Sequence, residues 1–236
     1  MSRYIGRGVH GTTVEVLGAQ IVDGTLAPGD VLDLAVIGRA LDVSLTALRE
    51  AIKVLMAKGL LDARQKKGTF VRPREEWNVL DSDVIRWRHQ SGDAVGVQRD
   101  LAEVRRAIEP AAAGLAAERR TDEDLVELEQ ALEEMRGARG GSAHDSAGAD
   151  LRFHQALLGA THNELFAQMS IFVEPALLIR DELVHGHEVT DPVPSHGRVV
   201  EAIIAQDADA AADAARALLD DSVADVEKVL TEEHDA

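Results

Sequence analysis

The first 76 residues carry short apolar stripes in an order that predicts three helices followed by a hairpin. Apolar residues at helical spacing predict successive helices over 12–23, over 34–41 and between Ser44 and Gly59. The Ser44 hydroxyl can cap the third helix by accepting from backbone N–H groups. Two alternating segments, 60–64 and 69–72, flank a turn and predict two short strands. This order is typical of a winged helix-turn-helix, an arrangement that binds double-stranded DNA.

From residue 93 onward the pattern is helical throughout. Because there is no strand pattern, we expect an antiparallel all-α bundle of six to seven helices behind the winged helix-turn-helix, and hence a mainly α protein. The expected domains are a DNA-binding domain over 1–76, a linker over 77–92 and a helical effector-binding and dimerisation domain over 93–236. The helical segments are predicted over 93–118, 121–138, 143–160, 163–186, 194–206 and 208–231.

The charge of the chain is distributed unevenly along it. The formal net charge is −17. Residues 1–78 hold 11 Lys/Arg and 9 Asp/Glu, a balance of +2, and residues 79–236 hold 14 and 33, a balance of −19. Such asymmetry is typical of a nucleic-acid-binding part joined to a different domain. The chain has 7 aromatic residues, which disfavours stacking on single-stranded nucleic acid.

Two features of composition bear on location. There is no cysteine, which excludes disulfides and thiolate metal sites. The chain also has neither the apolar core of a signal peptide at its start nor an apolar run long enough for a membrane span. We therefore expect a cytoplasmic protein with no membrane partner.

The third helix and the hairpin tip offer residues suited to DNA. Thr46, Arg49 and Lys53 lie on the face opposite the apolar stripe, where a recognition helix would meet the major groove. Lys66 and Lys67 lie at the tip of the predicted wing, where we expect them to reach phosphates with no apolar neighbours.

This region resembles the winged-helix domain of the GntR family of bacterial transcription regulators. The resemblance implies that Ser44, Thr46 and Arg49 contact DNA, and that Gly68 lets the wing backbone come close to it. Leu45 departs from the family, which usually has arginine there, and leucine can touch a thymine methyl but cannot read guanine. The matching residues are Leu26, Pro28-Gly29, Leu32, Val43-Ser44, Leu48-Arg49-Glu50-Ala51, Leu55, Lys58-Gly59-Leu60 and Gly68-Thr69-Phe70-Val71.

The stretch between the two domains allows two interpretations. It is a linker packed by two tryptophans and Leu80, or it carries a family signature. In the second interpretation it resembles galactonate-responsive members of the family, through Trp77, Leu80-Asp81, Asp83 and Trp87.

The helical domain contains four residues that could bind a ligand. Asp150 and His154 are one helical turn apart, and with the distant His196 they form a set that could hold a metal ion. Arg105 lies in an apolar helix. From spacing alone, the bland interpretation is favoured: the histidines are ordinary polar residues of a bundle interior, and the arginine is a surface residue.

A second resemblance favours the ligand-binding interpretation. Residues 95–230 resemble the all-helical FCD-type domain of the FadR subfamily. The resemblance implies that Asp150, His154 and His196 hold a divalent metal, zinc or similar, and that Arg105 holds the carboxylate of an effector. A fourth family ligand, a histidine, aligns with Leu218, so we expect the metal to be weakly held. His185 and His187 could substitute for it, but no pattern places them.

Together these features predict a homodimeric transcription regulator, a repressor, that binds a palindromic operator. The predicted effector is a small hydroxylated carboxylate, a sugar acid such as galactonate. One alternative is a metal-dependent enzyme of the helical domain, but no general base or nucleophile stands in a recognisable arrangement. The other alternative is an acyl-CoA-responsive regulator, which the retained metal set disfavours. We therefore predict that the protein is not an enzyme.

Overall fold

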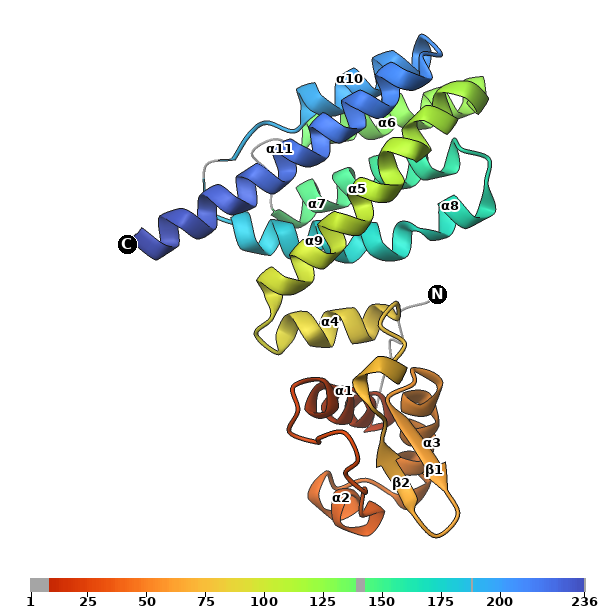
Figure 1. The fold of residues 1–236 in the computed structure, drawn as a ribbon, viewed down its shortest axis with the longest axis vertical. Coiled ribbons are helices and arrows are strands. Elements are labelled where there is room, and N and C mark those ends of the chain that lie inside the picture. Colours follow the sequence, from red (N-terminus) through yellow and green to blue (C-terminus); the bar gives the residue numbers. More distant parts are fainter. Residues whose placement is uncertain (1–8, 139–142, 188, 236) are drawn as a thin grey trace. The chain divides into compact units, whose positions relative to one another are not determined.

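The computed structural model describes residues 9–138, 143–187 and 189–235. The chain forms two compact units, one within residues 1–97 and the other within 98–236 (Figure 1). No helix in the described ranges is long and apolar enough to cross a membrane.

The N-terminal unit is a winged helix-turn-helix, as the sequence predicts. Strands β1 and β2 are antiparallel, with Leu61 opposite Val71, and Val31 adds an isolated bridge to Phe70. The elements are α1 (Val9–Val22), α2 (Leu34–Ala40), α3 (Leu45–Ala57), β1 (Leu61–Arg64), β2 (Gly68–Val71), a 3₁₀ turn at Arg74–Glu76 and α4 (Ser82–Gln90).

The ends of the two helices of the helix-turn-helix are set by local hydrogen bonds. The Asp33 side chain caps α2 by accepting from the backbone N–H groups of Ala35 and Val36. Ser44 caps α3 by accepting from the backbone N–H of Ala47 at 3.2 Å. Beyond α3, Gly59 has φ +75°, and an added Cβ would lie 2.9 Å from the Glu76 carbonyl oxygen, so only glycine fits this turn.

The segment expected to be a linker contains helix α4, which packs on α1. Trp87 is 1% exposed and belongs to the N-terminal core together with Trp77, whereas Leu80 is 49% exposed. Trp87 covers Gly18 of α1 so closely that a Cβ there would lie 2.4 Å from the indole, and its Nε1 donates to Glu15. The two tryptophans therefore join the segment after the wing to the DNA-binding fold, and the expected packing role of Leu80 is wrong.

The described part of the C-terminal unit is helical, which confirms the predicted bundle. The segment predicted as one helix over 163–186 is two helices, because the chain tightens at Met169 into a turn in which its N–H bonds to the Phe166 carbonyl. The helices are α5 (Ala94–Arg119), α6 (Asp122–Gly137), α7 (Ala143–Gly159), α8 (Glu164–Gln168), α9 (Ser170–Val184), α10 (Val193–Ile204) and α11 (Ala208–Asp235).

Helix α7 lies centrally in this bundle, between α6 and α9 (Figure 1). Its Phe153 is fully buried in an apolar core to which α5, α6, α10 and α11 also contribute. The neighbouring His154 is also buried, at 1% exposed, and the T-shaped contacts of Phe153 include His154 and His196. The packing of α7 therefore places polar side chains in the interior, where residues of α5 and α10 contact them.

Candidate functional site

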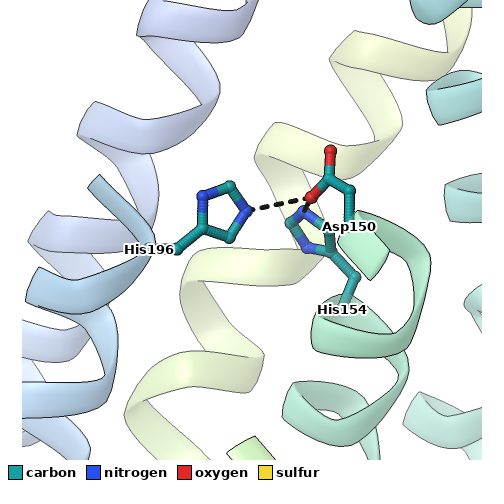
Figure 2. A group of neighbouring side chains, drawn as sticks. All are labelled: Asp150, His154 and His196. Atoms are coloured by element: carbon teal, nitrogen blue, oxygen red, sulfur yellow. Dashed lines mark hydrogen bonds and ion pairs between the residues drawn. The ribbon is translucent and has the colours of Figure 1, made fainter. Parts of the chain in front are cut away.

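The structure brings Asp150, His154 and His196 together. Asp150 and His154 come from adjacent turns of α7, and His196 comes from the first turn of α10 (Figure 2). Asp150 Oδ1 lies 3.2 Å from His154 Nε2 and 3.0 Å from His196 Nε2. Among the described residues, this is the group of three whose potential ligand atoms all lie within 4.8 Å of one another.

The hydrogen bonding of the two imidazoles favours a cation between them and Asp150. His196 Nδ1 lies 2.8 Å from the Pro192 carbonyl oxygen and must donate to it, because a carbonyl can only accept. A neutral ring then turns an unprotonated Nε2 toward the Asp150 carboxylate, so two acceptors face each other. An added proton resolves the conflict, and so does a metal ion bound by Nε2 and Asp150.

His154 faces the same carboxylate, but a guanidinium nitrogen of Arg105, which can only donate, also lies against its Nε2. Glu109 Oε2 lies 2.8 Å from its Nδ1, at an angle poor for a hydrogen bond, so the contact is mainly electrostatic. Its Nε2 faces Asp150 and is also 3.0 Å from Nη2 of Arg105. In metal sites, a ligating histidine usually has its second nitrogen held by a carboxylate or a carbonyl, as Glu109 and Pro192 hold these two. The donor set of one carboxylate and two imidazoles therefore fits a divalent ion such as zinc.

Arg105 is buried rather than on the surface, at 3% exposed. Its Nε donates to Glu109 Oε1 at 2.5 Å, one turn further along α5. Glu109 is 1% exposed and was missed by the sequence analysis, although its i, i+4 spacing from Arg105 was visible. It contacts both the guanidinium and the imidazole of His154, and so fixes the positions of the two groups.

The charges of this cluster shift each other's pKa values. Burial raises the pKa of Glu109, but the positive charges of Arg105 and His154 outweigh burial and lower it to about 2. Burial also raises the pKa of Asp150, yet its close contacts with the His154 and His196 rings hold it well below its ordinary value. Burial lowers the pKa of His154, and so does the positive charge of Arg105. The charge of Glu109 and the contact with Asp150 outweigh both, so the pKa of His154 is raised overall. Both carboxylates are therefore ionised at neutral pH.

Arg105 and the three potential metal ligands line one cavity of the C-terminal unit. Its volume is about 20 Å³, enough for one water molecule. Leu218 lies on the wall and is 5% exposed, where the family's additional histidine would stand, and it also belongs to the apolar core. His185 and His187 are not among the lining residues, which are Arg105, Asp150, His154, Leu177, Arg180, Thr190, Asp191, Pro192, Ser195, His196, Leu218, Asp221, Ser222 and Asp225.

The α3 residues expected at the DNA are exposed on the N-terminal unit. Leu45 begins α3 and is 48% exposed, and Thr46, Arg49 and Lys53 are exposed along the same helix. Lys53 pairs with Glu50 at 2.7 Å, and the Ser44 hydroxyl is occupied as the cap.

The wing tip is shaped by two residues in the left-handed region. Lys66 has φ +68° and Gly68 has φ +83°. Lys66 and Lys67 are both exposed, but Lys67 Nζ lies 3.7 Å from the centre of the Phe70 ring. The expectation that both lysines have no apolar neighbours is therefore wrong for Lys67, which makes a cation–π contact.

The comparison with known families agrees with both units. The model of bacterial regulatory proteins of the gntR family matches residues 11–71, and that of the FCD domain matches residues 100–221. The chain belongs to the GntR family of bacterial regulatory proteins. It is a DNA-binding transcription regulator of the GntR type with an FCD domain, and not an enzyme.

Individual relatives of this GntR-type regulator extend over most of its length. The galactonate operon transcriptional repressor of Escherichia coli K12 is 35% identical over 210 residues, 87% of this chain and 91% of that protein. The transcriptional regulator LutR of Bacillus subtilis 168 is 35% identical over 159 residues, 67% of this chain and 70% of that protein.

A solved structure supports the fold of the regulator. Lar, which controls expression of the Listeria monocytogenes agr system, gives a TM-score of 0.64 at 16% identity, over 94% of this chain and 98% of that one. At this identity the likeness concerns the fold alone.

Proposed function

We propose that the chain is a homodimeric repressor whose binding to a palindromic operator is controlled by a small hydroxylated monocarboxylate, a sugar acid of the galactonate class. The effector binds in the cavity of the C-terminal unit, together with a divalent metal ion. The observation that carries the proposal is that a buried arginine and a potential metal-binding triad line the same cavity.

The wall of the cavity favours this kind of ligand. Arg105 supplies a guanidinium suited to a carboxylate. Asp150, His154 and His196 would hold the metal, and a bound ion would offer open positions to water or to ligand oxygens. Eleven of the fourteen lining residues have polar or charged side chains, four of them aspartates, which disfavours the long apolar chain of an acyl-CoA. The galactonate operon repressor among the relatives is consistent with a sugar acid.

The size of the cavity requires movement on binding. A volume of about 20 Å³ holds one water molecule and not a six-carbon acid. Thr190 lies in the segment between α9 and α10, and its N–H and hydroxyl both donate to Asp225. We expect other lining side chains to move apart on ligand entry, which gives the effector a conformational change to stabilise.

We propose a dimer because one winged helix-turn-helix contacts only a short stretch of DNA. A single recognition helix contacts few base pairs, and a genome offers many competing sites. Two copies related by a two-fold axis read two half-sites, which is why we propose a palindromic operator. Arg49 would read a base, Leu45 a thymine methyl, and Ser44, Thr46, Lys53, Lys66, Lys67 and the Gly68 backbone would position the protein on DNA.

The test measures operator binding by the full-length protein, purified without a histidine tag, with zinc and galactonate added separately and together. We expect galactonate to weaken operator binding only when zinc is present. The variant His154→Ala should bind the operator as the unmodified protein does, but should bind no stoichiometric zinc and should not respond. His162→Asn is the control, because His162 is an exposed histidine paired with Asp124. An unchanged response in His154→Ala would overturn the proposal.

A further inference from the structure

The wall of the cavity contains a second arginine that the proposed metal and carboxylate contacts do not use. Arg180 lies on α9, and its Nη2 donates to Asp225 of α11 at 2.7 Å. Asp225 is 6% exposed and also accepts from the N–H and hydroxyl of Thr190, at 3.1 and 3.0 Å. Three donors from two segments thus hold the Asp225 carboxylate, and through it the guanidinium, in one position.

One donor of this guanidinium remains unused. The Arg180 Nε is buried and has no hydrogen-bond partner among the described residues. A buried donor without an acceptor is unfavourable by the cost of its lost hydration. Since Arg180 lines the cavity, an oxygen of a ligand bound there can satisfy it.

The charges of the wall decide which kind of oxygen fits. Asp150, Asp191, Asp221 and Asp225 line the cavity against only two arginines, Arg105 and Arg180. With neutral histidines, the lining residues carry an excess of two negative charges, and the buried Glu109 against Arg105 adds a third, which favours a divalent ion at the triad. Asp225 neutralises Arg180 as Glu109 neutralises Arg105, but the proposed metal ion adds positive charge only at the triad, so a second carboxylate on the ligand would find no uncompensated positive charge at Arg180. A hydroxyl oxygen accepts from Nε without this cost.

We propose that Arg180, held by Asp225, reads a hydroxyl group of the effector remote from the carboxylate that Arg105 and the metal receive. The Arg180–Asp225 pair is thus a specificity determinant for long polyhydroxy monocarboxylates over short hydroxy acids and over dicarboxylates. This inference rests on the proposed function, because it concerns the same cavity and ligand.

The test compares three probe ligands on the zinc-loaded full-length protein by calorimetry. Galactonate has one carboxylate and a chain of hydroxyls, and galactarate has a carboxylate at each end. Lactate is too short to reach Arg180 while its carboxylate is bound by Arg105 and the metal. In Arg180→Lys the charge facing Asp225 is kept but the fixed Nε donor is lost. We expect galactonate to bind roughly tenfold more weakly to this variant, the value of one buried hydrogen bond, and lactate to bind unchanged.

A matched control variant shows whether any loss of ligand binding is specific to Arg180. Arg136→Lys, on the exposed surface of α6, should change neither ligand, and both variants should keep the thermal unfolding midpoint of the unmodified protein. Equal weakening of galactonate and lactate would show that Arg180 only supports the cavity, and no weakening would show that it makes no contact. Tighter binding of galactarate than galactonate, lost in Arg180→Lys, would assign a carboxylate to Arg180. Each of these overturns the inference alone, whereas failure of galactonate to bind at all overturns the proposed function as well.

Discussion

The two candidate sites of this chain are built in opposite ways. The proposed DNA-binding face consists of exposed side chains on α3 and the β1–β2 hairpin, positioned by neighbours close in sequence, such as the Ser44 cap. The proposed effector cavity is built around buried charged and polar side chains from different helices, such as Arg105 of α5, His154 of α7 and Asp225 of α11. In the first site, residues can act separately. In the second, buried charges control one another, because a low-dielectric interior strengthens their interactions.

The difference gives each site its own response to substitution. Removing one exposed DNA contact should affect that contact alone, since distant and independent sites add in free energy. Removing one member of the cavity network should disturb several groups at once. One substitution should therefore affect one binding partner at the first site and two at the second.

The largest effect is expected from Glu109→Gln. The substitution keeps the size of the side chain but removes the charge that contacts both Arg105 Nε and His154 Nδ1. Loss of such a partner of a metal ligand typically costs 10–100-fold in metal affinity. We expect zinc binding to weaken by about that factor, and galactonate binding to weaken in parallel because Arg105 loses its anchor. Calorimetry with each ligand measures both.

Glu118→Gln is the matched control, because Glu118 lies on the same helix and is exposed. The interdependence of the cavity would be disproved if Glu109→Gln changed only one of the two affinities. A loss of operator binding in the absence of ligands would instead indicate that the substitution damages the fold.

The next effect concerns Arg49, on the DNA-binding face. It is exposed and lies opposite the buried Leu48, Ile52 and Leu55, so Arg49→Ala should leave folding nearly unchanged. If Arg49 reads a base through two hydrogen bonds, its loss costs about 1–3 kcal/mol at one position per half-site. Binding to operators varied base by base should show a relaxed preference at that position. Equal weakening on all sequences would make Arg49 a phosphate contact.

The sequence predicted these two sites unequally, and the reason is physical. The winged helix-turn-helix follows from local signals: apolar stripes at helical spacing, Ser44 as a cap and Gly59 as a stop, all of which the structure bears out. The helical bundle was also predictable, but not the break at Met169, where apolar residues continue on both sides.

The members of the cavity were only partly predictable. Asp150 and His154 are one turn apart on α7 and were visible as a pair, whereas Arg180 and Asp225 are 45 residues apart and meet only through the packing of α9 on α11. No periodicity in the sequence carries such a contact. Helix α4 was missed as part of the N-terminal fold for a related reason, since the fit of Trp87 onto Gly18 depends on a glycine distant in sequence.

A third prediction concerns the pH dependence of metal binding. Zinc needs neutral imidazole, so protons compete with it. The pKa of His154 is raised, chiefly by Glu109 against the effect of burial, so the competition should begin above the ordinary histidine range. As the pH falls below this pKa, zinc affinity should drop by about tenfold per unit for each proton displaced. Titration against a chelator of known affinity checks this.

The same experiment on Glu109→Gln sharpens the comparison of the sites. Without the Glu109 charge, the pKa of His154 should fall, and the onset of proton competition should move to lower pH. Operator binding by the metal-free protein should not follow this profile, because the DNA-binding face proposed here contains no histidine. Affinity for zinc that is independent of pH would contradict ligation by His154 and His196.

The smallest effect is expected at the wing, where the two lysines differ in surroundings. Lys66 has positive φ, so Lys66→Asn removes its charge with a residue that tolerates this backbone. Lys67 is exposed but rests over Phe70, and Lys67→Gln keeps a side chain of similar reach. If each lysine contacts a phosphate, each variant should reduce the slope of log affinity against log salt by about 0.9, and the two should add.

The two lysines should also differ in their effect on stability, because only Lys67 makes a cation–π contact. Lys67→Gln should slightly destabilise the hairpin, whereas Lys66→Asn should not. Lys228→Gln, an exposed charge removal on α11, should leave the slope unchanged. An unchanged slope in the double wing variant would place the wing away from the DNA, and the DNA-binding face would then consist of α3 alone.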